Sequence, residues 1–87
     1  MAYKIIWHQD AMDDLLKLDK KLQKQIINRI KNYLVDEPLS LGKPLKGIFK
    51  GLHRYRYGDY RIVYSIDRSD EQIIVLRVGH RKDVYND

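Results

Sequence analysis

The fold is decided by residues 52–66, which read LHRYRYGDYRIVYSI. The dipeptide Gly58-Asp59 is a two-residue turn of the kind that closes a β-hairpin. On both sides of it the residues alternate in character with a period of two, which predicts strands over 52–57 and 60–66. These two strands are therefore expected to pair antiparallel.

Alternation also assigns a face to each side chain of this hairpin. One side of the second strand is expected to be the core, and it carries Tyr60, Ile62, Tyr64 and Ile66. The other side carries Arg61, Val63 and Ser65. In the first strand Arg54 and Arg56 point the same way as each other. If the register brings them to the side of Arg61, three guanidinium groups share one open face, and no folding argument requires such a cluster.

The segment before this hairpin is expected to be mostly helical. Residues 3–7 predict a short strand, and Asp10 is expected to cap a helix in which Ala11, Leu15 and Leu18 recur at helical spacing. A second helix is predicted by one apolar stripe, formed by Leu22, Ile26, Ile30, Tyr33 and Leu34. Residues 19–21 join the two helices into a hairpin, and Pro38 is expected to end the second one.

Residues 39–51 contain several glycines and a proline, which predicts an irregular, basic connection. Residues 67–71 predict another turn, and 73–78 an almost wholly apolar strand. The expected fold is α+β, with an N-terminal strand and a helical hairpin packed on one face of a mostly antiparallel four-stranded sheet. We expect residues 1–87 to form a single domain.

Composition narrows the classes of function. The 87 residues have a net charge of +5 and no cysteine, so a disulfide framework, a thiolate metal site and a cysteine nucleophile are excluded. No apolar run suggests a signal peptide or a membrane span, and a cytoplasmic protein without cofactor or metal is expected. Between Lys43 and Arg61 stand six Lys or Arg and one acid, Asp59. A surface of this charge attracts polyanions such as nucleic acids.

Three stretches of the sequence resemble the RelE toxins of the RelE/ParE superfamily. They are PLKG at 44–47, GLHRYRYGDYRIVY at 51–64 and VGHRKDVY at 78–85. The resemblance implies the toxin of a type II toxin–antitoxin pair, an mRNA interferase that cuts mRNA in the ribosomal A site. It also implies a RelB-like antitoxin as partner, in a hetero-oligomer with the toxin.

The resemblance further implies a set of site residues. The catalytic positions of RelE-type toxins match Arg54, Arg56, Arg61, Arg81 and Tyr85. Nearby lysines are expected to bind RNA, and they are Lys43, Lys46, Lys50 and Lys82. Each of these residues also has a structural explanation: Arg61 could pair with an acid, Arg81 could brace the chain end, and Tyr85 could anchor the tail by packing.

RNA can be cut without a metal when the ribose 2′-hydroxyl attacks the adjacent phosphorus and leaves a 2′,3′-cyclic phosphate. Arginine suits this chemistry because its planar fork binds phosphate oxygens bidentately and keeps its proton. For the same reason Arg54 and Arg56, which stand where the best-studied RelE pattern has lysines, cannot act as bases. Tyr85 is the first candidate for proton transfer. His80 is the alternative, since imidazole exchanges protons readily near neutral pH.

Two other functions stay open on the sequence alone. A ParE-like toxin would poison DNA gyrase and generally lacks the full arginine and tyrosine set. A catalytically inert relative would only bind an antitoxin or nucleic acid. Two assays distinguish the three functions. The ribonuclease would cut ribosome-bound message, the ParE-like toxin would cause loss of supercoiling by gyrase, and the inert relative would do neither.

Overall fold

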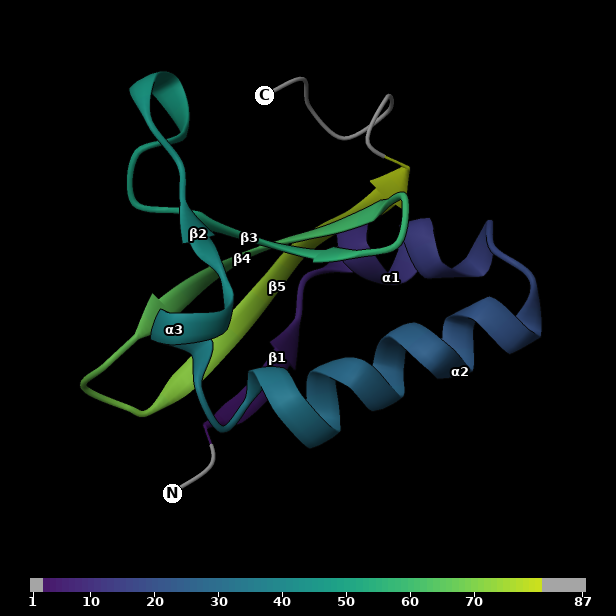
Figure 1. Ribbon diagram of the computed structural model, residues 1–87, viewed down its shortest axis with the longest axis horizontal. Coiled ribbons are helices and arrows are strands. Elements are labelled where there is room, and N and C mark those ends of the chain that lie inside the picture. The colour runs from purple at the N-terminus through teal and green to yellow at the C-terminus, as the bar shows by residue number, and fades with distance from the viewer. Residues whose placement is uncertain (1–2, 81–87) are drawn as a thin grey trace.

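The structure is a computed structural model that describes residues 3–80. Arg81, Lys82 and Tyr85 therefore lie outside the described residues. In chain order the elements are β1 (Lys4–Trp7), α1 (Gln9–Leu16), α2 (Lys20–Arg29), a π-helical turn (Ile30–Leu34), α3 (Pro38–Leu41), β2 (Lys43–Pro44), a 3₁₀ turn (Gly47–Phe49), β3 (His53–Tyr57), β4 (Tyr60–Asp67) and β5 (Gln72–His80). Figure 1 shows their arrangement.

The strands form one mixed sheet in the order β1-β5-β4-β3-β2. The contacts between β2, β3, β4 and β5 are antiparallel, and only β1 pairs in parallel, with β5. The α+β class and the N-terminal strand with its helices on a sheet are confirmed. The expected strand number was too low by one, because the two-residue β2 is too short to show a period-two pattern.

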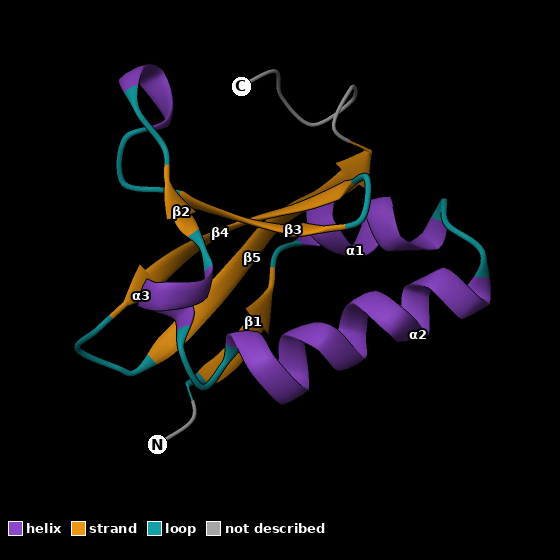
Figure 2. Ribbon diagram, in the orientation of Figure 1, coloured by secondary structure: helices purple, strands orange, loops and turns teal. Residues whose placement is uncertain are grey.

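Both helices of the hairpin cover the same face of the sheet (Figure 2). Ala11 and Leu15 from α1, with Ile26 and Ile30 from α2, belong to one buried cluster with the sheet residues. The sheet supplies the side chains expected from alternation and their neighbours on β5, namely Ile62, Tyr64, Ile73, Val75 and Val78. The apolar stripe of the second helix is confirmed except at Tyr33, which is 53% exposed and lies 4.8 Å below the guanidinium carbon of Arg29.

Two of the expected helix boundaries were wrong. The N-cap of α1 is His8, whose Nδ1 accepts a hydrogen bond from the Asp10 backbone N–H, and Asp10 sits in the first turn instead. The helix before Pro38 already ends with the π-helical turn at Leu34, and Pro38 begins α3. Proline fits that position because the first helical N–H has no intrahelical partner.

Residues 39–51 are more regular than expected. They hold the end of α3, the strand β2 and the 3₁₀ turn. The segment is fixed to the sheet by the buried Tyr64, whose hydroxyl donates a 2.6 Å hydrogen bond to the Pro38 carbonyl. Burial raises the pKa of this phenol far above its ordinary value, so the hydroxyl keeps its proton and acts as a donor.

A carboxylate ties α1 to the sheet beyond the end of β1. Asp14 accepts hydrogen bonds from the Val78 backbone N–H at 2.9 Å and from the Arg77 side chain at 2.9 and 3.2 Å. Burial raises the pKa of Asp14, but these hydrogen bonds and the charge of Arg77 outweigh burial and hold it below its ordinary value of 3.8. Because β1 ends opposite Val75, Asp14 satisfies a strand N–H that β1 cannot reach.

None of the helices within residues 3–80 combines the length and the apolar character needed to cross a membrane.

Asp14→Asn should lower the free energy of unfolding by about 1–2 kcal/mol at neutral pH, since it weakens a charge-assisted hydrogen bond whose donor is half exposed. The folded pKa of Asp14 is depressed, so its contribution is complete above its unfolded pKa and disappears as the pH falls through the folded value. Denaturant titrations at several pH values should show the two proteins converging below about pH 4. Asp13→Asn is the control, because Asp13 is exposed and accepts a hydrogen bond from the Gln9 side chain of the same helix. Equal effects of the two substitutions would contradict the role of Asp14.

Gly42→Ala should destabilise the fold by about 1–3 kcal/mol through overpacking. A Cβ at Gly42 would overlap the Tyr64 hydroxyl and lie 2.8 Å from its ring carbon Cζ. Tyr64 is fully buried and cannot move aside. Gly51→Ala provides a comparison, since its Cβ meets no atom within 4 Å and only the strain of φ +97° remains. Thermal unfolding of both variants checks the prediction, which fails if Gly42→Ala unfolds like the native protein.

Candidate functional site

The site is built on the β3–β4 hairpin, whose register answers the question the sequence left open. Arg56 pairs directly with Arg61, and Arg54 pairs with Val63. Residues opposite each other in an antiparallel pair share a face, so all three arginines lie on the same side of the sheet. This side is the one opposite the core residues Ile62 and Tyr64.

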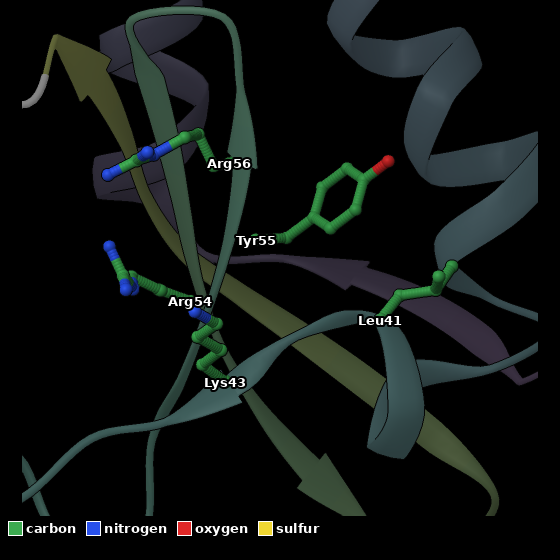
Figure 3. Close-up of a pocket in the computed structure, with 5 residues that line it drawn as sticks. All are labelled: Leu41, Lys43, Arg54, Tyr55 and Arg56. Carbon is green, nitrogen blue, oxygen red and sulfur yellow. The ribbon is translucent and has the colours of Figure 1, made fainter.

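A fourth cation joins them from β2. Lys43 pairs with Arg54 and is exposed, which places its side chain on this side of the sheet. Figure 3 shows Lys43, Arg54 and Arg56 extending to one side of β3, while Tyr55 and Leu41 lie to the other. We call the set Lys43, Arg54, Arg56 and Arg61 the basic face.

The arginines of the basic face differ in exposure. Arg56 is exposed and Arg54 is half-buried. Arg61 is only 5% exposed, although it was expected to be an exposed side chain. It lies on the central strand β4, where its strand neighbours are Arg56 on β3 and Gly79 on β5. Arg61 is therefore largely shielded from solvent, whereas Arg56 beside it is open to a ligand.

A hollow of about 220 Å³ opens beside Arg54 and Arg56. It exists because β2 contributes only two residues and pairs with β3 only as far as Arg54. Beyond that rung the outer edge of β3 is not covered by β2. Leu41, Lys43 and Tyr55 complete the lining (Figure 3).

Two cations directly opposite each other on neighbouring strands repel, and this arrangement destabilises a sheet in the absence of other contacts. The Cα atoms of such a pair are about 4.5–5.5 Å apart. An anion with several oxygens, such as a phosphate diester, can accept hydrogen bonds from both guanidinium groups at once. The Arg56–Arg61 pair is thus suited to binding phosphate.

The other expected RNA-binding residues that the structure describes are Lys46 and Lys50, both exposed in the connection from β2 to β3. Arg81, Lys82 and Tyr85 lie outside the described residues. Among residues 3–80 no group of three or more His, Asp or Glu side chains is placed to hold a metal ion.

His80 lies on the other side of the sheet from the arginines. It pairs with Tyr60 at the end of β5, and its ring meets the Tyr60 ring edge-on with centroids 5.7 Å apart. Tyr60 packs against the core cluster, and His80 also lines a hollow with α1 residues Lys17 and Leu18. The side of the sheet on which His80 lies could have been predicted from the sequence, since the residue opposite His80 follows once β4 and β5 are aligned as a hairpin.

His53 was not singled out from the sequence. It stacks on Tyr64 with ring centroids 5.5 Å apart, and its Nδ1 is buried without a hydrogen-bond partner. Burial, and to a lesser extent the charge of Arg68, lowers the pKa of His53. A neutral imidazole that stacks on a core tyrosine has a packing role. It lies opposite Tyr64, away from the basic face.

Comparison with known proteins identifies the family. The profile described as "ParE toxin of type II toxin-antitoxin system, parDE" matches residues 5–85. Toxin RelG of Mycobacterium tuberculosis is 35% identical over 85 residues, which cover 98% of both chains. Toxin RelE of the same bacterium is 35% identical over 75 residues, covering 86% of this chain and 77% of its own.

Solved structures agree with this assignment. A chain of the toxin–antitoxin complex RelBE2 from M. tuberculosis superposes with a TM-score of 0.89 at 33% identity, covering 93% of this chain and 100% of that chain. A mutant of Escherichia coli toxin RelE in the free state has a TM-score of 0.78 at 21% identity, covering 97% and 88%, and shows the shared fold. The resemblance drawn from the sequence is confirmed: the chain belongs to the RelE/ParE superfamily, as a RelE-family toxin of a type II toxin–antitoxin system.

Proposed function

We propose that this toxin is a ribosome-dependent endoribonuclease that cuts mRNA in the ribosomal A site. The observation that carries the proposal is the Arg56–Arg61 pair, with Arg54 and Lys43 on the same side of the sheet. The toxin would act in the cytoplasm, where ribosomes are found.

In the proposed reaction the ribose 2′-oxygen attacks the adjacent phosphorus and the bond from phosphorus to the 5′-oxygen breaks. The upstream fragment ends in a 2′,3′-cyclic phosphate, and the downstream fragment begins with a 5′-hydroxyl. The 2′-hydroxyl loses its proton to a base, and the leaving 5′-oxygen gains one. The phosphate carries extra negative charge in the transition state, and donors fixed in advance stabilise that charge most strongly.

The two paired arginines suit different parts of this task. Arg61 is buried and can present a preorganised donor to the developing charge. Arg56 is exposed and can bind and release the RNA. Arg54 and Lys43 extend the positive surface along the backbone of the message, and Arg81 is proposed to add a further charge.

Proton transfer is assigned to Tyr85 in this proposal. The register supports this choice over His80, because His80 pairs with Tyr60 on the helix-covered side while Arg61 faces the opposite side. Neighbouring arginines would lower the pKa of a phenol and increase the fraction present as phenolate, the form that accepts a proton, at neutral pH.

The open geometry of the site supports a need for the ribosome. The hollow beside Arg54 is only partly enclosed, and the arginines cannot by themselves bend a flexible message into the in-line arrangement. A ribosome that holds the A-site codon would supply that arrangement. A RelB-like antitoxin is the proposed partner, since the similar M. tuberculosis and E. coli toxins are found in RelBE complexes.

The family profile is described by ParE, which makes a gyrase-inhibiting toxin the second candidate. The names of the relatives, RelG and RelE, favour the ribonuclease. Incubation of the toxin with gyrase and relaxed plasmid, in parallel with programmed ribosomes, distinguishes them. Supercoiling lost with the message intact would replace the proposed function by the ParE-like one.

Arg56→Ala should reduce cleavage of the A-site codon by about 10²- to 10³-fold, because it removes one donor to the developing charge. Arg56 is exposed, so the fold should remain intact. Lys24→Ala is the charge-matched control on the exposed side of α2 and should cut within about twofold of the native protein. Single-turnover cleavage on programmed ribosomes measures both. Full activity of Arg56→Ala would exclude the paired arginines as the site.

Arg61→Ala is expected to lose activity and also some stability, because the side chain is buried. Arg61→Lys keeps the charge and most of the aliphatic stem but loses the bidentate fork. We expect it to fold and to cut at least tenfold more slowly. Thermal unfolding and antitoxin binding report whether each variant is folded. A fully active Arg61→Lys protein would contradict a bidentate role.

Tyr85→Phe should abolish cleavage while binding to ribosomes and antitoxin persists, since only the phenolic hydroxyl is lost and the aromatic ring is kept. His80→Ala should retain cleavage within about tenfold. Measuring the single-turnover rate against pH for the native protein and both variants tests the assignment. If His80→Ala removes the acidic limb of the pH profile, where activity rises as the base loses its proton, and Tyr85→Phe does not, the base is His80.

A further inference from the structure

The connection from β2 to β3 carries an apolar side chain at its tip. Residues 45–52, which we call the protrusion, extend away from the sheet, and their 3₁₀ turn lies at the upper left of Figure 2. Ile48 in this turn is 94% exposed, the highest exposure among the large hydrophobic residues described. Single exposed aliphatic residues are common. What distinguishes Ile48 is its setting.

The protrusion is braced by its own backbone. Leu45 N–H donates to the Leu52 carbonyl at 2.9 Å, and Leu52 N–H donates to the Phe49 carbonyl at 3.0 Å. Lys50 N–H donates to the Gly47 carbonyl at 3.1 Å. Gly47 and Gly51 allow the tight reversal because they adopt φ values of +67° and +97°. The exposed position of Ile48 is thus imposed by a defined backbone.

The charge around the tip has one sign. Lys46 and Lys50 flank Ile48 on either side and are both exposed. From Leu39 to Gly58 the chain contains five Lys or Arg and no acid. The base of the protrusion adjoins the Pro44–His53 pair, and the next pair is Lys43 with Arg54 of the basic face. The lysines therefore lie in the connection between the two strands that carry Lys43 and Arg54 of the basic face.

The composition of the tip distinguishes a nucleic-acid partner from a protein partner. A protein partner usually covers a contiguous apolar patch of several hundred Å². Here only two neighbouring apolar residues, Ile48 and the 37% exposed Phe49, stand between Lys46 and Lys50, and Leu41 lies with Tyr55 on the other side of β3 from the basic face (Figure 3). A small apolar tip between phosphate-binding cations is an arrangement that nucleic-acid-binding proteins use to contact the faces of bases.

We propose that the protrusion is a second RNA-binding site, in which Ile48 packs against a nucleobase and Lys46 and Lys50 bind the flanking phosphates. This inference rests on the proposed function. The base belongs either to the message beyond the cleaved codon or to ribosomal RNA, and both have the same chemistry.

The test compares Ile48→Ser with Leu16→Ser, a matched control on α1 that also replaces an exposed aliphatic side chain, 76% exposed, by serine. Affinities are measured for a short 2′-O-methylated single strand, which cannot be cut, and for ribosomes programmed with a message methylated at the A-site codon. Ile48→Ser should bind at least one of these RNAs about tenfold more weakly, from the usual contribution of a base contact. Ile48→Met, which keeps an apolar side chain, should bind within about threefold of the native protein, and Leu16→Ser should be unchanged.

The salt dependence of binding distinguishes the apolar contribution of Ile48 from the electrostatic contribution of the lysines. Ile48→Ser should leave the slope of log affinity against log salt unchanged, whereas Lys50→Ala should reduce it by about 0.7 for single-stranded RNA. Weaker binding to the free strand assigns the base to the message, and weaker binding to ribosomes alone assigns it to ribosomal RNA.

Three results would overturn the inference. They are unchanged binding of both RNAs by Ile48→Ser, an equal loss in Leu16→Ser, and a loss of antitoxin binding without a loss of RNA binding. The proposed function fails separately, if the native toxin does not cut programmed ribosomes while its RNA binding remains measurable. A native toxin that binds neither RNA would end both.

Discussion

The register of the β3–β4 hairpin is the constraint on which the rest of the structure depends. Gly58, with a φ of +61°, and Asp59 form the two-residue connection, which fixes Tyr57 opposite Tyr60. From that pair outward, Arg56 meets Arg61 and Tyr55 meets Ile62. A slip of one residue would turn every arginine of β3 toward the helices and every tyrosine toward solvent. The same turn therefore separates a core face from a basic face.

Tyr64 transmits this register to the edge of the sheet. Its ring lies in the core, and its hydroxyl binds the Pro38 carbonyl at the start of α3. Gly42 leaves the space that the hydroxyl occupies, so the chain passes close to the sheet before β2 begins. Lys43 is the next residue and pairs with Arg54. The position of the fourth cation and of the protrusion thus depends on one buried phenol.

The sequence was most informative where a local pattern coincided with a tertiary role. The alternation around Gly58 predicted both the strands and the shared side of Arg54 and Arg56, because turn geometry and burial act on the same residues. The alternation did not determine the register between the two strands. The prediction that Arg61 shares a face with Arg54 and Arg56 therefore depended on a register that only the structure supplied. Residues 39–51 were misread because α3 and β2 are too short to have a period and are held by contacts with distant residues such as Tyr64.

The burial of Arg61 was missed for a different reason. Alternation gives the side of a sheet that a residue faces but not how closely its neighbours on adjacent strands enclose it. Asp14 was likewise seen only as part of a favourable helix turn, since the Val78 N–H that it satisfies lies 64 positions away in the sequence. The burial of Asp14 could have been inferred from its position three residues after Ala11 and one before Leu15. This position places its carboxylate beside the buried stripe of α1.

The two faces of the sheet have opposite physical requirements. The helix-covered face gains stability from apolar burial, and the basic face loses some through repulsion between paired cations. A domain of 87 residues has a modest core, so it can tolerate only a limited concentration of like charge. Arg61, on the central strand of the sheet, is the least exposed of the four cations of the basic face. An anion on the basic face would reduce that repulsion, which means that binding a polyanion and stabilising the toxin are physically coupled.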